Sequence, residues 1–309
     1  MLIYLPIAEI PVNVLIILSM GGAVGFISGM FGVGGGFLLT PLLIFTGVPP
    51  AVAVASVASQ IVASSTSGAL FHWRRQSIDM PLALVLLAAG SVGSAAGVVL
   101  FGYLRNIGQL DLVLSLAYVT FLGSIGGLML VESLNAMRRT RSGQRARGRK
   151  PGQHNWVHRL PWKVRFRRSR LYISIVPVIA IGSSIGFLGT MLGIGGGFIM
   201  VPALIYLLRV PTSVVIGTSL IQILGTMAIA TILHAATTQT VDVVLALVLM
   251  VGGVIGAQLG ARIGSTLKAE QLRLLLALIV LAVGVRFFVD LVLTPEDVYS
   301  LSVLERLTS

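Results

Sequence analysis

The stretch GFISGMFGVGGGFLLTPLLIFTG at residues 25–47 decides the fold, because it returns at residues 186–208 as GFLGTMLGIGGGFIMVPALIYLL. Eleven of the 23 aligned positions are identical, including the glycine run, the phenylalanine after it and a proline four residues further on. Self-similarity of this length within one chain indicates an internal repeat. The sequence therefore predicts a duplicated unit.

The match continues beyond this stretch while the offset between the halves grows from 161 to 163 residues. Polar residues and glycines of the following apolar runs align in pairs: Gln60 with Gln222, Ser64 with Thr226, His72 with His234, and Gly90, Gly93 and Gly97 with Gly253, Gly256 and Gly260. We predict a first transmembrane repeat at 1–137, a basic connection at 138–170, and a second repeat with a short tail at 171–309.

The chain is too apolar for a soluble fold. Hydrophobic residues make up 56% and charged residues 10% of its 309 positions, against about 25% charged in ordinary soluble domains. The apolar residues fall in runs of roughly 20, the length that a helix needs to cross the hydrocarbon core. Eight spans are predicted, near 12–31, 52–71, 82–104, 111–131, 172–193, 213–233, 242–263 and 271–293, with shorter apolar pieces at 37–46 and 198–208. The predicted fold is an all-α polytopic membrane protein of two homologous four-helix repeats.

Each repeat carries the sequence G-x-G-G-G inside its first apolar run. Glycine costs a helix about 1 kcal/mol, so three in succession favour a break, and the proline that follows is tolerated best in the first turn of a new helix. Each first helix is therefore predicted to break and to continue as a half-helix. The alternative is that the glycines only allow close helix packing.

We expect the two breaks to form a site for a small anion near the middle of the membrane. Unwound backbone at that depth is buried in protein or lines a cavity, and the N-terminus of a helix attracts anions. The predicted substrate-binding residues belong to the breaks and to the polar positions of the next helix: Gly34, Gly35, Gly36, Phe37, Gly195, Gly196, Gly197, Phe198, Gln60, Gln222, Ser64 and Thr226.

The polar residues within the spans leave alternatives open. A buried glutamine amide needs a partner, and Gln60 and Gln222 either donate to the anion or bond to a neighbouring helix. His72 and His234 end their predicted helices, and His72 precedes Trp73 and two arginines, a composition typical of a membrane interface. An interfacial role is favoured for both histidines, and a gate or proton relay is the alternative.

Positive charge is concentrated in one connection. The net charge is +12, and 13 of the 22 Lys and Arg residues lie between residues 138 and 170. Positive loops stay on the cytoplasmic side, so this connection is predicted to be cytoplasmic and to contact anionic lipid headgroups, rather than nucleic acid. With four spans per half, both termini lie on that side and the halves are parallel. Insertion of a short apolar piece would instead invert them.

The doubled G-x-G-G-G-F-x-x-x-P pattern resembles the TauE/SafE family of sulfite exporters, also called TSUP transporters. The resemblance extends over residues 12–293. It implies transport of sulfite, sulfonates or related organic anions across a bacterial inner membrane. Cargo varies within that family, so the resemblance does not identify the anion.

The predicted function is secondary transport of a small anion, in the direction of export, with a passive anion channel as the alternative. The chain has no cysteine and shows no catalytic triad, metal-ligand spacing or nucleotide-binding loop, so no enzyme activity, metal or cofactor is expected. No acidic residue lies in the middle of a predicted span, whereas carboxylates relay protons in many pumps. Export is therefore expected to be driven by the membrane potential.

Overall fold

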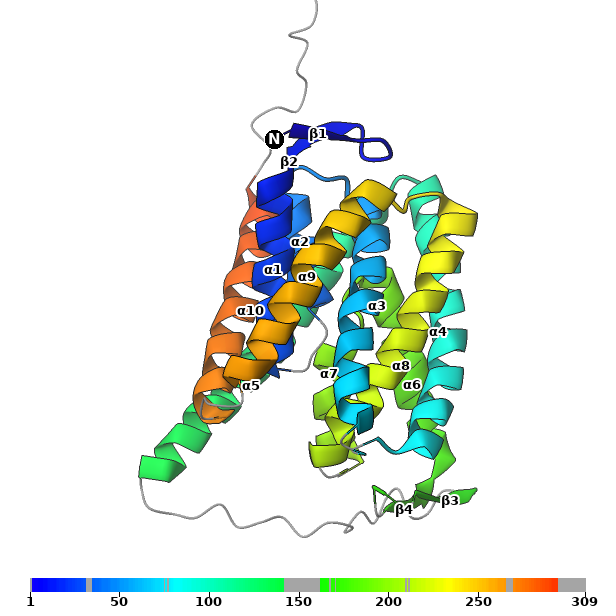
Figure 1. Ribbon diagram of the computed structural model, residues 1–309, viewed down its shortest axis with the longest axis vertical. Coiled ribbons are helices and arrows are strands. Elements are labelled where there is room, and N and C mark those ends of the chain that lie inside the picture. Colours follow the sequence, from blue (N-terminus) through cyan, green and yellow to red (C-terminus); the bar gives the residue numbers. More distant parts are fainter. Residues whose placement is uncertain are drawn as a thin grey trace, which may run out of the picture.

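The computed structural model describes residues 2–31, 35–74, 76, 78–141, 162–166, 168–169, 171–208, 210, 212–264 and 269–293. Within them the chain is almost entirely helical, with one short antiparallel hairpin at each end of the helix bundle (Figure 1). The predicted all-α polytopic fold is confirmed. Neither hairpin is predicted from the sequence.

The first half contains one hairpin and five helices. Strands β1 (Leu2–Leu5) and β2 (Ile10–Asn13) precede the helices, which are α1 (Val14–Phe31), α2 (Gly36–Phe45), α3 (Pro50–Arg74), α4 (Met80–Asn106) and α5 (Leu110–Arg141).

The second half repeats this order. Strands β3 (Lys163–Phe166) and β4 (Leu171–Ser174) are followed by α6 (Ile175–Leu192), α7 (Gly197–Pro202) with its π-helical continuation η2 (Ala203–Leu207), α8 (Thr212–Leu233) with its π-helical continuation η3 (His234–Thr238), α9 (Val243–Gly264) and α10 (Ala269–Val292). That the halves derive from one duplicated unit stays a prediction.

Seven helices of the described residues are long and apolar enough to cross a membrane. They are α3, α4, α5, α6, α8 with η3, α9 and α10, and together with the shorter α1 they correspond to the eight predicted spans. Both short apolar pieces are helical as well, as α2 and as α7 with η2. Each half therefore has five helices rather than four.

The short helices reverse the direction of the chain. α1 leads away from the β1–β2 hairpin, and α2, only about 15 Å long, returns towards it, so that Pro49 and Pro50 line a cavity together with Ile7 of the hairpin. Consequently α3 starts at the same end as α1, and α5 finishes at the opposite end, where β3 and β4 lie (Figure 1).

The second half starts at that opposite end and runs the other way, so α10 finishes at the end of the bundle where the N-terminal hairpin lies (Figure 1). The expectation of parallel halves with both termini beside the basic connection is wrong. The physical reason is that α2 reverses the direction of α1, and α7 with η2 reverses the direction of α6, so each pair returns the chain to the end from which it started. This is the inverted arrangement that the sequence left as the alternative.

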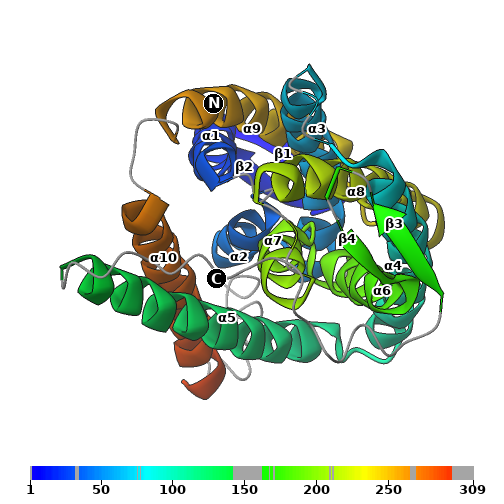
Figure 2. The same ribbon diagram turned by 90° about the horizontal axis from the view of Figure 1, so that it is seen from below.

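Helices of the first half pack against helices of the second half. α1 packs against α9, α6 against α4, α3 against α8, and α5 against α10; Figure 2 shows α5 and α10 crossing at one edge of the bundle. A Cβ atom on Gly25 of α1 would overlap the backbone of Gly253, and one on Gly93 of α4 would overlap the carbonyl of Ser183. The glycines at these two interfaces serve close packing.

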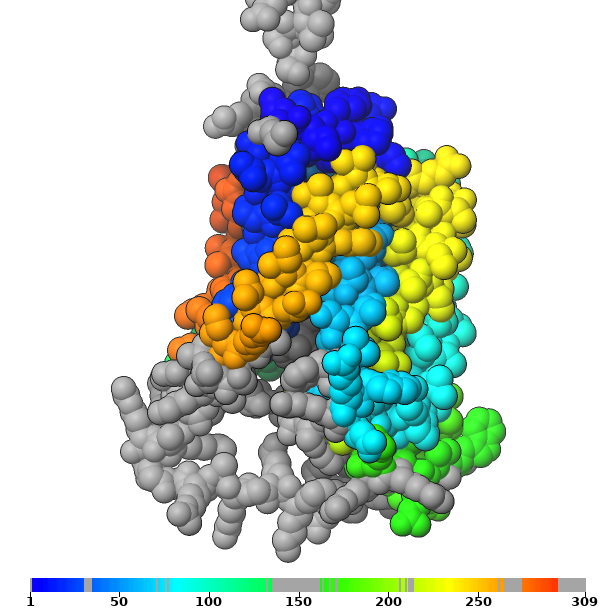
Figure 3. All heavy atoms as spheres, viewed as in Figure 1, coloured from blue at the N-terminus to red at the C-terminus, as the bar shows by residue number. Residues whose placement is uncertain are grey.

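One hairpin lies at each end of the bundle. The N-terminal hairpin lies across one end, as the dark blue surface in Figure 3 shows. Its Leu5 and Ala8 are buried, so the hairpin is part of the packed structure.

Candidate functional site

The start of α2, directly after the first glycine run, contacts the second glycine break inside the bundle. The Thr40 hydroxyl on α2 donates a 3.2 Å hydrogen bond to the backbone carbonyl of Gly193, which lies 153 residues further along the chain. A Cβ atom on Gly36 would overlap that same carbonyl oxygen and the side chain of Ile61. Only glycine at position 36 allows the two breaks to approach this closely.

The backbone of the second break requires glycine for a different reason. Gly193, Gly195 and Gly196 have φ angles of 64°, 76° and 73°, in the left-handed region that glycine adopts without steric cost. Gly193 ends α6, and Gly196 is the residue immediately before α7. The predicted break is therefore present here, at the residues that the motif indicated.

The first break lies between Phe31 and Gly36, the end of α1 and the start of α2. The Gly35 N–H donates a 2.8 Å hydrogen bond to the hydroxyl of Ser28 on α1, so α1 itself positions the start of the half-helix. Gly34, predicted as a site residue, lies outside the described residues.

Aromatic rings pack around the point where the breaks meet. Phe37 and Phe198, the residues that follow the two glycine triplets, stack with ring centroids 4.6 Å apart and planes 12° apart. Phe121 of α5 packs with its edge towards Phe198. The Tyr118 hydroxyl, also on α5, donates a hydrogen bond to the carbonyl of Leu192 at the end of α6. The structure thus brings the predicted phenylalanines together and adds Tyr118, which the sequence does not single out.

The two glutamines are buried at separate helix interfaces. Gln60 on α3 lies against Gly253 of α9, and Gln222 on α8 lies against Gly90 of α4, with its Nε2 atom 2.9 Å from where a Cβ of Gly90 would be. Each amide fills space that a missing side chain leaves on the facing helix. The glutamines therefore contact different flanks of the bundle, and their role as anion ligands stays a prediction.

The hydroxyls near the glutamines bond mainly within their own helices. Thr226 accepts a 2.9 Å hydrogen bond from Gln222 Nε2 and donates to the Gln222 carbonyl. Ser64 donates to the carbonyl of Ile61. These bonds match the local backbone bonding that serine and threonine commonly make in helices.

The two histidines occupy different environments. His72 is partly buried in the last turn of α3, as predicted. His234 is fully buried at the start of η3, with its ring edge-on to Phe101 at 4.8 Å and its Nδ1 atom 3.3 Å from the Thr238 hydroxyl. The interfacial role expected for His234 is therefore wrong, because the π-helical turn and α4 cover the ring.

Two buried aspartates hold the hairpins onto the bundle. Asp242, directly before α9, accepts hydrogen bonds from the N–H groups of Ile7 at 2.9 Å and Ala8 at 3.4 Å in the N-terminal hairpin, and from Leu245 in α9 at 3.0 Å. The N–H of Asp242 donates to the hydroxyl of Ser56 on α3. The Asp242 carboxylate thus connects the N-terminal hairpin to α9, and the Asp242 backbone N–H connects this point to α3.

Asp79 makes the corresponding set of bonds at the other end. Its carboxylate accepts from the N–H and the hydroxyl of Ser169 in the β3–β4 turn, at 2.8 and 2.7 Å, and from Leu82 in α4 at 3.5 Å. Its own N–H donates to the hydroxyl of Thr218 on α8. A signal for this pair exists in the sequence, because Asp79 and Asp242 are separated by the repeat offset of 163.

The fold and the buried polar residues together indicate a class of membrane protein. A bundle of apolar membrane-length helices, two broken helices meeting inside it, and buried polar side chains on its inner helices are typical of secondary transporters. The chain is thus a multi-pass membrane transporter.

Comparison with known proteins identifies the family. The family model described as sulfite exporter TauE/SafE matches residues 17–287, and the chain belongs to this family. A "Probable membrane transporter protein" of Xylella fastidiosa (strain 9a5c) is 30% identical over 88% of this chain and 94% of its own length. YjnA of Bacillus subtilis (strain 168), also a "Probable membrane transporter protein", is 29% identical over 87% of this chain and 98% of its own length.

A more distant relative carries a more specific name. "Sulfite exporter TauE/SafE family protein 3" of Arabidopsis thaliana is 28% identical over 39% of this chain and 26% of its own length. No solved structure matches the chain.

Proposed function

We propose that the protein exports a small anion of the sulfite or sulfonate class across the bacterial inner membrane, through a site where the two glycine breaks meet. The observation that carries the proposal is a set of buried polar atoms that have no hydrogen-bond partner among the described residues. They are both amide atoms of Gln60, the Ser65 hydroxyl, Gln222 Oε1 and His234 Nε2.

All of these atoms belong to α3 and to α8 with its continuation η3, two helices that pack against each other. A buried polar group without a partner costs roughly 1–3 kcal/mol, and such groups are normally satisfied by ordered water or by a ligand. Gln60 faces α9 and Gln222 faces α4, so these atoms support hydrated or ligand-binding positions on both flanks of the α3–α8 pair.

α3 connects the Gln60 position to the breaks. Ile61, next to Gln60, is the side chain that a Cβ atom on Gly36 would meet, and the backbone of Val54 on the same helix lies against Gly193. One helix therefore contacts both breaks and carries the partnerless amide. In this proposal a ligand at the breaks lies within reach of the Gln60 amide.

The anionic class of cargo is supported by electrostatics and by the names of relatives. The positive end of the α2 dipole points at the break, and the described spans contribute no carboxylate there. The family description and the Arabidopsis relative are both named for sulfite export. The positive charge of the 138–170 connection supports an orientation with that connection in the cytoplasm.

The test is transport by the purified protein in liposomes loaded with sulfite or an alkylsulfonate. Gly36→Ala pushes the two breaks apart, and we expect at least a tenfold loss of efflux. Gly123→Ala is the matched control, because a Cβ atom on this helical glycine of α5 meets nothing within 4 Å. Both variants are checked for thermal stability in detergent. Wild-type efflux from folded Gly36→Ala would refute the proposed site.

The same liposomes separate a carrier from a channel. Efflux that saturates with internal anion, and that accelerates when the same anion is present outside, identifies a carrier. Flux that rises without saturation and shows no acceleration identifies a passive channel.

A further inference from the structure

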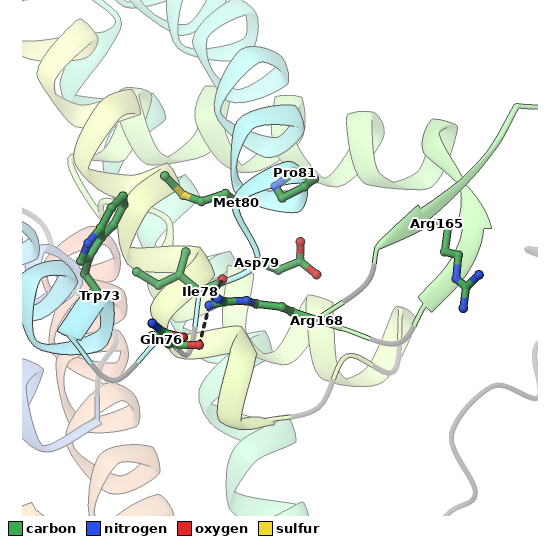
Figure 4. A pocket seen from close by; sticks show the side chains of 8 residues that line it. All are labelled: Trp73, Gln76, Ile78, Asp79, Met80, Pro81, Arg165 and Arg168. Atoms are coloured by element: carbon green, nitrogen blue, oxygen red, sulfur yellow. Dashed lines mark hydrogen bonds between the residues drawn. The ribbon is translucent and has the colours of Figure 1, made fainter.

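Cavities away from the glycine breaks lie at both ends of the bundle. The one at the β3–β4 end measures about 500 Å³, and Figure 4 shows that Arg165 points out of it while Arg168 lies beside Gln76. Arg168 donates to the carbonyls of Gln76 and Ile78 at 2.6 and 3.2 Å, so the two arginines do not converge on one ligand. The cavity at the N-terminal hairpin end leads instead to a buried histidine.

This second cavity, of about 320 Å³, is bounded by the N-terminal hairpin, the start of α3 and the connection between α4 and α5. Arg105 and Asp111 in its lining are exposed, so it opens to the solution. Thr240, also in the lining, is buried, and its hydroxyl lies 2.8 Å from the hydroxyl of Thr238 in η3. The Thr238 hydroxyl lies 3.3 Å from Nδ1 of His234. Two hydroxyls therefore connect the cavity to the imidazole.

The hydroxyl of Thr238 can serve the imidazole in two ways. A threonine hydroxyl has one hydrogen to donate and can accept two hydrogen bonds. When it donates to the His234 carbonyl, at 2.9 Å, it accepts from Nδ1–H and leaves Nε2 as a free base. When it turns to Nδ1, that nitrogen can receive a proton from the Thr240 side. Nε2 is buried and has no hydrogen-bond partner among the described residues, so the ring has room for a further proton.

The ring of His234 lies against the last turn of α6, directly before the second break. The backbone carbonyl of Thr190 is beside the ring. In a regular helix that carbonyl accepts from the N–H four residues later, but the N–H of Ile194 donates to Gly189 instead, at 3.1 Å. The Thr190 hydroxyl is bonded to the hydroxyl of Ser94 on α4, at 2.7 Å. A protonated imidazole can therefore supply the donor that α6 does not give to Thr190.

The charged groups near this path bond to other partners. Arg105 of α4 donates to the carbonyl of Thr238 at 2.5 Å, the Asp242 carboxylate accepts from the hairpin N–H groups, and Asp111 is exposed in the cavity. Phe101 of α4 covers the ring edge-on. Within the described part of the chain, no carboxylate bonds to the ring or to the two threonines, so the charge on the ring depends on protons that reach it through the hydroxyls.

We propose that His234 is a proton-binding site that exchanges protons, through Thr238 and Thr240, with the solution at the N-terminal hairpin end. Water in the cavity gives a proton to Thr240, Thr240 gives its own proton to Thr238, and Thr238 gives its own to Nδ1. The two hydroxyls are restored and the ring becomes an imidazolium cation. The reverse transfers return the proton to the cavity.

The positive charge forms beside the second break. α6 ends there, and the negative end of its dipole opposes the binding of an anion. An imidazolium beside the Thr190 carbonyl offsets that negative end, so the anion binds more tightly when the hairpin side is acidic. This effect on the anion rests on the proposed function, whereas proton binding by His234 does not. The membrane potential remains the driving force, and the proton adjusts the affinity.

Protonation of His234 is measured without transport, by nitrogen-15 NMR of the full chain labelled in its histidine rings and reconstituted in lipid. The chain has four histidines, and the difference between the wild type and His234→Asn isolates the signals of His234. We expect these signals to move towards those of an imidazolium between about pH 8 and about pH 4.5, the range around which histidine titrates. A neutral ring throughout that range would overturn the inference.

The same spectra test the route of the proton. Thr240→Val removes the first hydroxyl and should slow the exchange of the His234 ring N–H with water at least fivefold. Thr237→Val is the matched control, because Thr237 lies in the same π-helical turn, is exposed, and donates its hydroxyl to the Leu233 carbonyl. Both variants are checked for thermal stability. An unchanged exchange rate in folded Thr240→Val would rule out this path.

The side of access is measured by efflux of an alkylsulfonate, whose charge is constant in this pH range, from right-side-out and everted membrane vesicles at a clamped potential. Reaction of Glu9→Cys with an impermeant maleimide identifies the face that bears the hairpin. Acidifying that face should lower the anion concentration for half-maximal efflux about twofold, the effect of one charge at a helix terminus. Acidifying the other face should not.

The outcomes separate this inference from the transport proposal. Loss of the pH response in Thr240→Val and in His234→Asn, with the response kept in Thr237→Val, supports the path. An equal response from both faces, or one that survives in Thr240→Val, overturns it. If the vesicles release no anion above the level of vesicles without the protein, the transport proposal fails, and the NMR titration and exchange rates still decide whether His234 binds the proton by this route.

Discussion

Removing the Asp242 carboxylate should release the N-terminal hairpin while the rest of the bundle stays folded. In Asp242→Ala the N–H groups of Ile7 and Ala8 lose their acceptor. A hydrogen bond to a charged group contributes about 1.5–3 kcal/mol. The bond to Ile7 is short and the bond to Ala8 is long, so we expect the free energy of hairpin opening to fall by about 3 kcal/mol.

The lower free energy of hairpin opening predicts faster labelling of a thiol buried in the hairpin. About 3 kcal/mol corresponds to roughly a hundredfold rise in the open population, and local opening controls the reactivity of a buried thiol. The chain has no cysteine, and the Ala8 side chain is buried, so Ala8→Cys reports opening by its rate of reaction with a maleimide. We expect Asp242→Ala to accelerate that reaction by about two orders of magnitude.

The pair of aspartates supplies the control. Ile173 on β4 is buried, and Ile173→Cys reports opening of the other hairpin. Asp242→Ala should leave the Ile173→Cys rate unchanged, and Asp79→Ala should raise it without affecting Ala8→Cys. Unchanged rates, or an equal rise at both hairpins in either variant, would show that the carboxylates do not act as separate local anchors.

Three further predictions concern packing, orientation and energy source. Gly253→Ala places a methyl group on the Gln60 amide, so displacement of Gln60 should lower both thermal stability and efflux. Gly123→Ala should change neither quantity, and equal behaviour of the two variants would contradict this prediction. In intact cells an impermeant maleimide should label Glu9→Cys but not Arg165→Cys, because the basic connection is cytoplasmic, and the reverse pattern would invert the orientation. A potential of roughly 150 mV supplies about 3.5 kcal/mol to a departing monoanion, so liposome efflux should follow a potassium–valinomycin potential; flux that follows only a pH gradient would indicate proton coupling.

The candidate site was predictable in part. The glycine run fixes where α6 ends and α7 begins, because only glycine adopts the left-handed φ angles found at Gly193 and Gly196. That Gln60 and Gln222 are equivalent follows from their aligned positions. The sequence does not predict that these glutamines face Gly253 and Gly90, on two different helices. Local sequence carries no information about which distant helix lies opposite a given residue.

The sequence by itself determined the membrane-spanning class, the helix breaks and the family, because hydrophobic run length and glycine propensity act on neighbouring residues. Only the tertiary structure decided the opposite directions of the two halves, the contact between Gly36 and Gly193, the burial of His234 and the anchoring by Asp79 and Asp242. Each of these depends on contacts between residues that are far apart in the chain. The Thr40 hydroxyl, for example, donates to the carbonyl of Gly193, 153 residues further on, and a local sequence pattern carries no information about such a contact.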